Sequence, residues 1–271
     1  GEYPRSMETG PQILARIREA VIGDDQVMYG PYGARRVTYA DYIASGRALS
    51  FIEDFVREQV LPRYANTHSE SSGTGLQTTR LREDARAIIH SAVHGTEDTV
   101  VIFTGSGSTA AINKIVGILG LRIPADLDRK YALSAQIPAA ERPVVFIGPY
   151  EHHSNELPWR ESIADVVTIH ENADGHIDMV HLEAELIRFA ARPLKIGSFS
   201  AASNVTGILT DTKAITALLH AHDALAFWDY AAAAPYIDID ASGEDAIFIS
   251  PHKFIGGPGT PGVLIVNRRL L

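Results

Sequence analysis

The chain has 271 residues, of which 45% are hydrophobic and 21% are charged, a composition typical of a globular protein with a sizeable core. Its formal net charge of -9, without any block of basic residues, argues against nucleic acid or an anionic membrane surface as the main partner. The sequence contains no cysteine, no apolar run of ~18 residues and no signal-like N-terminus, so it lacks disulfides and thiol nucleophiles and is expected to be cytoplasmic.

The first quarter of the chain is predicted to be helical. Apolar residues recur at helical intervals over 11–22 and again over 51–56. A polar stretch rich in Gly, Ser and Thr, 66–79, has no apolar period and is predicted to be a loop, and a further helix should run over 81–95 until a glycine stops it. We therefore expect residues 1–65 to form a helical N-terminal segment.

From residue 98 onwards, short apolar strands alternate with helical patterns. The predicted strands are TVVIF at 99–103, PVVFIG at 143–148, DVVTI at 165–169, LKIGSFSA at 194–201, ALAFWDY at 224–230, AIFIS at 246–250 and GVLIV at 262–266. Helical patterns at 108–120, 182–192 and 212–222 separate several of them. This alternation predicts an α/β fold with a mostly parallel sheet, helices on both of its faces, and a ligand site at the carboxyl ends of the strands.

The first of these strands ends in GSGSTA at 105–110, which leads into a predicted helix. Small residues at this point leave backbone N–H groups, and the hydroxyls of Ser108 and Thr109, at a positive helix terminus, which suits a phosphate group. The spacing also matches a short dinucleotide-binding fingerprint. A tight turn before a capped helix is the alternative that needs no ligand.

Polar residues follow three other predicted strands. His152 lies in EHHSN after 143–148, Asn204 lies in SNVTG after 194–201, and Asp229 lies near the end of its own strand. A carboxylate at the end of an apolar strand is costly to bury unless it meets a cation or a strong donor. Each residue also has a structural alternative: a hydrogen-bonded histidine, a turn asparagine or a loop-capping aspartate.

The stretch Ser250-Pro251-His252-Lys253 follows the strand AIFI and precedes GGPGTPG. A semi-apolar pocket disfavours the charged form of a lysine, which favours a nucleophilic amine able to form a Schiff base. A surface lysine before a flexible loop is the alternative. With a phosphate loop and a strand-end aspartate, Lys253 would complete the three contacts that pyridoxal phosphate needs: an anion cradle, a partner for the ring nitrogen and a lysine for the aldehyde.

These motifs resemble class V aminotransferases, a family of fold-type-I pyridoxal-phosphate enzymes that includes the cysteine desulfurases and selenocysteine lyases. The likeness runs from about Tyr39 to Val266. YADYIAS at 39–45 resembles the family's opening motif near the substrate site, and SGSTAAIN, EHHSN, SNVTG, the Asp229 strand and SPHK follow in the family's order. The resemblance implies a large cofactor-binding domain over 66–271, the cofactor pyridoxal 5'-phosphate, and an amino-acid substrate that reacts through a lysine aldimine by transamination or by desulfurase-like or lyase-like chemistry.

The resemblance also implies a role for each residue. Lys253 would be the aldimine lysine, Asp229 would pair with the protonated ring nitrogen, and His152 would stack on the ring, which makes these three the predicted catalytic residues. Asn204 would form a hydrogen bond near the phenolic oxygen of the cofactor. The phosphate would be held by Ser108, Thr109, Ser250 and His252. No metal is expected.

Two features depart from the family's pattern. Desulfurase-like members carry a glutamine three residues after the aspartate, where this chain has Ala232, which weakens the case for the desulfurase subtype. The family's small C-terminal domain supplies a substrate-binding arginine and, in desulfurases, the catalytic cysteine. Nothing in the 271 residues corresponds to this domain, so we expect the chain to be a large-domain fragment.

Two other functions stay open from the sequence. One is an NAD-dependent oxidoreductase that uses the GSGSTA loop, and the other is a catalytically silent protein that keeps the fold for binding. By resemblance we expect a homodimer, because active sites in the family borrow residues from the neighbouring subunit. Asn66, His68 and Thr79 are predicted to line such a shared site. No nucleic-acid or membrane partner is expected.

Overall fold

The computed structural model describes residues 9–68 and 71–271, which divide into two compact units. The N-terminal unit contains the described residues up to Glu83 together with His252–Gly259. The sheet unit contains Asp84–Pro251 and Thr260–Leu271. Among the described residues, no helix is long and apolar enough to cross a membrane.

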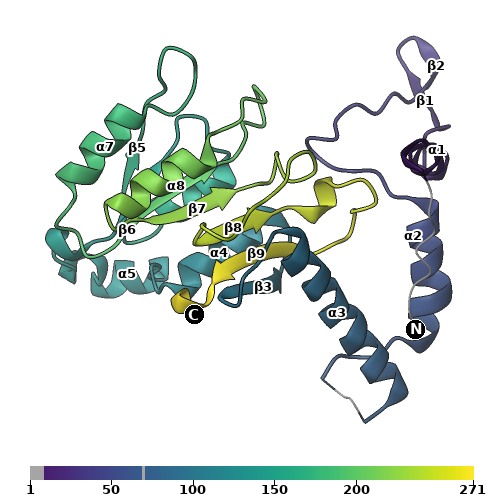
Figure 1. Ribbon diagram of the computed structural model, residues 1–271, viewed down its shortest axis with the longest axis horizontal. Coiled ribbons are helices and arrows are strands. Elements are labelled where there is room, and N and C mark those ends of the chain that lie inside the picture. The colour runs from purple at the N-terminus through teal and green to yellow at the C-terminus, as the bar shows by residue number, and fades with distance from the viewer. Residues whose placement is uncertain (1–8, 69–70) are drawn as a thin grey trace. The chain divides into compact units, whose positions relative to one another are not determined.

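The sheet unit is built on seven strands, which lie in the order β3-β9-β8-β7-β6-β4-β5 within the described part of the chain (Figure 1). The strands are β3 (Thr99–Thr104), β4 (Val144–Ile147), β5 (Asp165–Thr168), β6 (Lys195–Ser200), β7 (Leu225–Asp229), β8 (Ala246–Ile249) and β9 (Gly262–Asn267). The pairs from β5 to β8 are parallel, whereas β9 runs antiparallel to both β3 and β8. The prediction of a mostly parallel sheet is confirmed, and the reversed direction of β9 was not foreseen.

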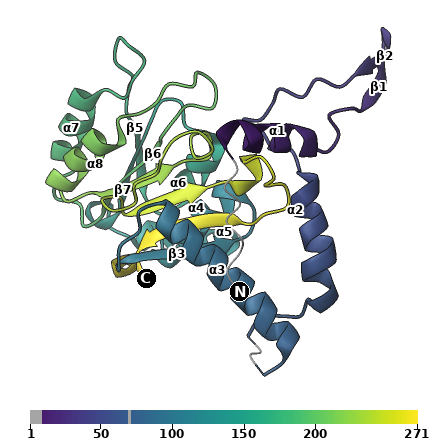
Figure 2. The same ribbon diagram turned by 45° about the vertical axis from the view of Figure 1, so that its right-hand side comes forward.

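Helices pack on both faces of this sheet, as predicted (Figure 2). The helices are α4 (Gly107–Ile118), α5 (Ala125–Tyr131), α6 (Leu157–Arg160), α7 (Met179–Arg188) and α8 (Thr212–Ala221). Two neighbouring residues of β7 identify the faces, because successive side chains of a strand point to opposite sides. Phe227 packs in one core cluster with Ile112 of α4, whereas the indole N–H of Trp228 donates a 2.9 Å hydrogen bond to the Thr216 hydroxyl of α8.

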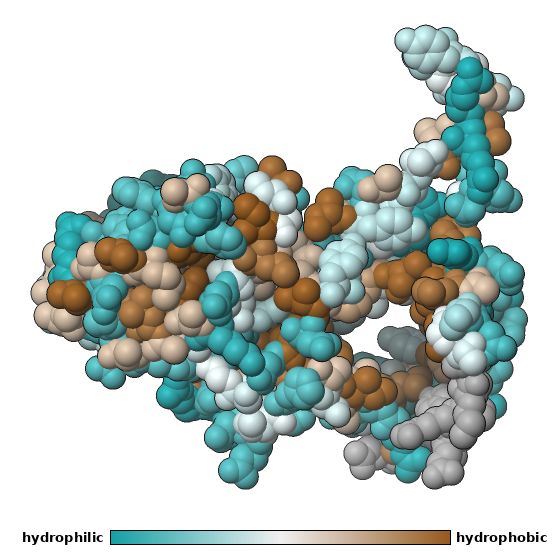
Figure 3. Space-filling model, turned by 45° about the horizontal axis from the view of Figure 1, so that its top comes forward, coloured by the Kyte–Doolittle hydropathy of each residue, from teal (hydrophilic) through white to brown (hydrophobic). Residues whose placement is uncertain are grey.

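Several strands of the sheet unit are unbroken apolar runs because both of their faces are buried in the core. All four residues of β4, VVFI, are buried, since helices cover both sides of the strand. Trp159, Phe227 and Phe248 are completely buried, and burying each such side chain is worth about 1.5–3 kcal/mol or more. On the face shown in Figure 3, hydrophilic residues cover much of the surface and apolar ones form small patches among them.

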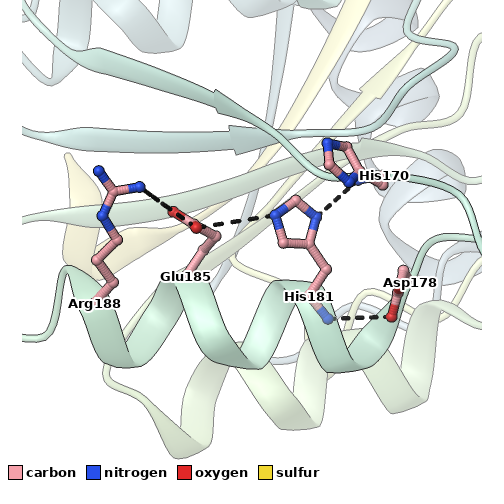
Figure 4. Close-up of polar contacts among 5 residues, drawn as sticks. All are labelled: His170, Asp178, His181, Glu185 and Arg188. Atoms are coloured by element: carbon pink, nitrogen blue, oxygen red, sulfur yellow. Dashed lines mark hydrogen bonds and ion pairs between the residues drawn. The ribbon is translucent and has the colours of Figure 1, made fainter.

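A polar cluster fixes the start of α7 (Figure 4). The Asp178 carboxylate accepts hydrogen bonds from the N–H groups of Val180 at 3.0 Å and His181 at 3.1 Å, as an N-cap residue does. The His181 ring accepts a 3.0 Å hydrogen bond from the backbone N–H of His170 and lies 4.2 Å from the His170 ring. The cluster therefore ties α7 to the segment that leaves β5. No group of three His, Asp or Glu side chains suited to a metal occurs in the part of the chain that the structure describes.

The N-terminal unit contains helices and also an antiparallel hairpin. Its regular elements are α1 (Gly10–Ala20), β1 (Val27–Gly30), β2 (Gly33–Arg36), α2 (Ser50–Phe55) and the first part of α3 (Gly73–Ala92). The hairpin strands were not predicted, because all eight of their residues are exposed and show no apolar alternation.

The loop predicted over 66–79 is wrong in its second half, because α3 begins at Gly73. The hydroxyl of Ser72 accepts a 3.1 Å hydrogen bond from the backbone N–H of Gly75 and caps the helix. Glycines in the first turn each cost a helix about 1 kcal/mol, so local propensity hides this start. Thr79, predicted to lie in the loop, is part of the helix, and residues 69–70 of the predicted loop lie outside the described residues.

Candidate functional site

The carboxyl ends of β6, β7 and β8 bring polar side chains to one face of the sheet. Ser200 is the register partner of Asp229, and Asp229 is the partner of Phe248, two residues before Ser250. Side chains two residues apart in a strand share a face. Because Phe248 packs in the cluster with α4, the strand alternation assigns Ser200, Asp229 and Ser250 to the α4 face.

Two residues predicted to hold a phosphate are in direct contact. The hydroxyl of Ser250 accepts a 2.8 Å hydrogen bond from the backbone N–H of Ser108 and lies 3.0 Å from the Ser108 hydroxyl. Ser108 is 1% exposed and Ser250 is 4% exposed. The end of β8 therefore satisfies one of the four N–H groups that the start of α4 leaves without an intrahelical partner.

Glycines allow the loop before α4 to approach β9 closely. Gly105 and Gly107 have φ values of 34° and 60°, in the left-handed region that favours glycine. A Cβ atom at Gly262 would lie 2.2 Å from the Gly107 carbonyl oxygen. Thr109 is exposed in the first turn of α4. The helix terminus and its hydroxyls therefore form a donor set of the kind that binds phosphate.

Asp229, the predicted partner of a ring nitrogen, is 3% exposed at the end of β7. One of its carboxylate oxygens accepts a 2.9 Å hydrogen bond from the backbone N–H of Ala231, so the loop-capping role considered for this residue is present. Such a bond does not exclude a ligand, because a carboxylate has about four acceptor sites.

A carboxylate that sequence reasoning missed lies beside Asp229. Glu151 accepts hydrogen bonds from the Ser200 N–H at 3.0 Å, the Ser200 hydroxyl at 2.7 Å and the Asn155 amide at 2.9 Å. Enclosure of the carboxylate, and to a smaller extent the charge of Asp229, raise the pKa of Glu151 to about 7. The local sequence offers only one weak sign of this role, which is that Glu151 and Asn155 bracket the histidines of EHHSN.

The other two predicted residues of the sheet unit are exposed at the same edge. The His152 ring accepts a 3.2 Å hydrogen bond from the Ser154 N–H and lies 2.8 Å from the Ser154 hydroxyl, at the start of a 3-10 turn. Asn204 lies in the turn after β6, where the Ser203 hydroxyl accepts hydrogen bonds from the backbone N–H groups of Val205 and Thr206. Both side chains are therefore open to a ligand, and neither is part of the hydrogen-bond network around Glu151.

The last two predicted residues, His252 and Lys253, belong to the N-terminal unit and lie in a 3-10 turn over Pro251–Lys253. The His252 carbonyl accepts a 2.8 Å hydrogen bond from the N–H of Gly46, which directly follows YADYIAS. A Cβ atom at Gly46 would lie 1.9 Å from the Phe254 carbonyl oxygen. Partial burial, followed by the charge of Lys253, lowers the pKa of His252.

The sheet order does not favour the NAD-dependent alternative. β3, which carries GSGSTA, lies at one edge of the described sheet and pairs there with β9 in an antiparallel manner. A dinucleotide-binding unit needs a parallel strand beside the first one, so that the nucleotide lies across a crevice between parallel strands.

Two solved structures share this architecture. The cysteine desulfurase from Thermococcus onnurineus NA1 is 19% identical and superposes with a TM-score of 0.71, covering 97% of this chain and 58% of its own. The NifS-like protein from Rickettsia africae ESF-5 is 23% identical with a TM-score of 0.67, covering 85% of this chain and 58% of its own. These likenesses confirm the predicted fold class.

Two curated relatives agree with the structural likeness. The probable cysteine desulfurase of Halalkalibacterium halodurans is 28% identical over 239 residues, which are 84% of this chain and 52% of that protein. That of Staphylococcus epidermidis is 28% identical over 264 residues, which are 93% of this chain and 58% of that protein. This chain thus spans little more than half the length of these relatives. The family model for aminotransferase class V matches residues 38–271, and the chain therefore belongs to the aminotransferase class-V family.

Proposed function

We propose that this protein is a pyridoxal-phosphate-dependent enzyme that acts on an amino acid by transamination or by desulfurase-like or lyase-like chemistry. Members of the class V aminotransferase family use this cofactor, and the curated relatives are named probable cysteine desulfurases. The observation that carries the proposal is the arrangement at one face of the sheet, where the Ser108–Ser250 contact and the buried Asp229 lie at the carboxyl ends of parallel strands.

The residues at this edge fit the cofactor. Gly105 and Gly107 carry no side chain at the start of α4, which leaves their backbone open to an anion, and the exposed Thr109 adds a hydroxyl donor. Asp229 would accept a hydrogen bond from the protonated ring nitrogen, His152 would stack on the ring, and Lys253 would hold the cofactor through a bond between its Nζ and the aldehyde carbon, with release of water. The remaining contacts would come from Ser108, Asn204, Ser250 and His252.

Two of these residues would also hold or move protons, and a third would hold the ring. Bound pyridoxal phosphate supplies an electron sink for bonds at the α-carbon of an amino acid. Asp229 would keep the ring nitrogen protonated, because its buried carboxylate gains most from a positive neighbour. Lys253, once released by the substrate amine, would take up or return the α-proton at its Nζ. His152 would hold the ring plane in place.

The reaction subtype depends on groups beside the phenolic oxygen. By the family resemblance, the position three residues after Asp229 would face this oxygen; it is occupied by Ala232, which is buried and offers no hydrogen-bonding side chain. L-cysteine is the first substrate to test because the curated relatives are named for it, and L-alanine is the matched substrate without sulfur.

The decisive test is an absorption spectrum of the purified protein with pyridoxal phosphate, before and after borohydride reduction, followed by peptide mapping. We expect a yellow protein whose reduced adduct maps to Lys253. The matched control is Lys213→Ala, on the surface helix α8, which should keep the adduct, whereas Lys253→Ala should lose it. An adduct spread over surface lysines, with no preference for Lys253, would contradict the proposal.

We also propose a homodimer with an active site shared between subunits, in which Asn66 and His68 contact the neighbouring subunit. Both residues precede α3 and are candidates for the shared site only by family resemblance. Light scattering after size exclusion, with pyridoxal phosphate present, should give twice the mass of the chain. A monomer that binds the cofactor and reacts with an amino acid would contradict this part of the proposal.

A further inference from the structure

The turn that carries His152 is held against β6 by two side chains, Glu151 and Asn155. Both oxygens of Glu151 accept hydrogen bonds: one from the Ser200 N–H at 3.0 Å, the other from the Ser200 hydroxyl at 2.7 Å and the Asn155 amide at 2.9 Å. Two of these donors, the Ser200 N–H and the Asn155 amide NH2, cannot act as acceptors and hold one oxygen of the carboxylate each. An ionised carboxylate also accepts from the Ser200 hydroxyl.

Asn155, the second part of this fastening, has all the hydrogen bonds that its amide can make. Its oxygen accepts from the Trp159 indole at 3.1 Å and from the Ser198 hydroxyl at 2.6 Å. Its nitrogen donates to Glu151 at 2.9 Å and to the Ser198 carbonyl at 3.1 Å. Because every amide position is used, the orientation of Asn155 is fixed, and it can present only a donor to Glu151.

The backbone is shaped around the same carboxylate. A Cβ atom at Gly148, the residue that follows β4, would lie 2.7 Å from a Glu151 carboxylate oxygen. A side chain at this position would push the Glu151 carboxylate from its place beneath the turn. His152 is the next residue in the chain, so the position of its backbone depends directly on where the Glu151 side chain is held.

We propose that Glu151 is a positioning residue that sets the place of the His152 ring at the cofactor, by holding the EHHSN turn against the end of β6 beside Asp229. This inference rests on the proposed function, because it gives the His152 ring the task of stacking on pyridoxal phosphate. It assigns Glu151 no contact with the substrate or the cofactor.

The charges around Glu151 make the proposal sensitive to pH. Asp229 faces it from β7 and disfavours its ionised form, while His152 adjoins it in the chain and His176 lines the same small cavity. The pKa of Glu151, raised to about 7 by enclosure, means that the carboxylate changes its protonation near neutral pH. Protonation of Glu151 would convert one of its acceptor oxygens into an O–H donor that faces other donors, and this would loosen the turn.

The experiment compares Glu151→Gln and Ser200→Ala with the control Glu156→Gln, which removes a surface ion pair with Arg160 from the same segment. A glutamine at 151 would direct an NH2 group at the donors of Ser200 and Asn155. We expect Glu151→Gln to weaken pyridoxal phosphate binding about tenfold and to shift the pH midpoint of the bound cofactor's visible band. Ser200→Ala should change both quantities in the same direction but less, and Glu156→Gln should change neither.

Two readouts separate this inference from its alternatives. Glu151→Gln with an unchanged dissociation constant and an unchanged pH midpoint would overturn it, and if that variant fails to fold, the same result for Ser200→Ala would do so. A lower melting temperature alone, with both quantities unchanged, would also count against it. If the parent protein binds no pyridoxal phosphate, the proposed function fails. The inference about Glu151 can then be tested by nitrogen NMR of the His152 ring. A ring signal that is the same in the parent protein and in Glu151→Gln would overturn the inference.

Discussion

The hydroxyl of Ser250, at the end of β8, accepts a 2.8 Å hydrogen bond from the backbone N–H of Ser108 in the first turn of α4. The two serines are 142 residues apart in the sequence and both are buried. This contact connects the last strand before SPHK to the helix whose terminus is proposed to bind phosphate. A change at either residue should therefore affect both folding and cofactor binding.

Replacing Ser250 by alanine should test this coupling. The substitution leaves the buried N–H of Ser108 without its partner, so we expect a loss of about 1–2 kcal/mol in the free energy of unfolding and weaker binding of pyridoxal phosphate. Urea denaturation and a cofactor titration measure the two effects. Ser91→Ala, on the exposed face of α3, should stay within about 0.5 kcal/mol of the parent protein. Equal stability of the two variants would show that the contact contributes little.

A pair of glycine substitutions should separate close backbone approach from helix propensity. A Cβ atom at Gly262 would lie 2.2 Å from the Gly107 carbonyl, so Gly262→Ala should force the phosphate loop away from β9 and cost about 2 kcal/mol or more. Gly117, in α4, has open space around its Cα, and Gly117→Ala should stabilise the protein by about 0.5–1 kcal/mol. Thermal unfolding measures both. Opposite signs are expected, and a neutral Gly262→Ala would contradict the close approach.

Asp229→Asn should separate the electrostatic role of this residue from its structural one. The asparagine oxygen can still accept the hydrogen bond from the Ala231 N–H, so the melting temperature should change little. Loss of the negative charge should slow the reaction of the cofactor-loaded protein with an amino acid by about two orders of magnitude. Stopped-flow absorbance with L-cysteine and with L-alanine measures the rate. An unchanged rate would leave Asp229 with the loop-capping role alone.

Glu244 should make stability fall as the pH rises. Burial, followed by the charges of Asp240 and Asp245, raises the pKa of Glu244 from its ordinary value of 4.5 to about 8, against a hydrogen bond from Tyr230 that lowers it. Between these two pH values the folded state binds a proton that the unfolded state lacks, so the free energy of unfolding decreases through this window.

Glu244→Gln should therefore reduce this pH dependence. We expect the variant to match the parent protein near pH 5 and to exceed it at pH 8 by on the order of 1 kcal/mol, after allowance for screening by solvent. Part of the slope should persist, because Glu151 has a raised pKa in the same range. Urea denaturation across pH 5 to 8 measures the difference. A constant difference between the two proteins at every pH would contradict this account.

The strands were predictable where local signals agree with the fold. Runs such as VVFI at 144–147 are apolar because helices cover both sides of the strand, and that pattern is visible without any structure. The same pattern carries no information on direction, so the antiparallel course of β9 was not predictable from GVLIV. The start of α3 was missed because the Ser72 cap compensates for glycines that local propensity counts as helix-breaking.

The candidate site likewise contains residues that could be predicted from the sequence and one that could not. His152, Asn204, Asp229 and Lys253 were predicted as candidates because each follows an apolar strand or belongs to a family motif. Glu151 was not predicted, because Ser200, which donates two of its three hydrogen bonds, comes near it only after β4 and β6 become neighbours. Sequence spacing says little about a residue whose partners lie on another strand.

The sequence by itself determined the family, the alternation of strands and helices, and the kinds of side chain at the strand ends, because these depend on composition and local order. The tertiary structure decided which of those side chains meet. Strand register brings Ser200, Asp229 and Ser250 to one face, and the Ser108–Ser250 hydrogen bond joins residues that only the folded sheet places together. Such contacts depend on long-range strand pairing, which is not encoded in any short stretch of the chain.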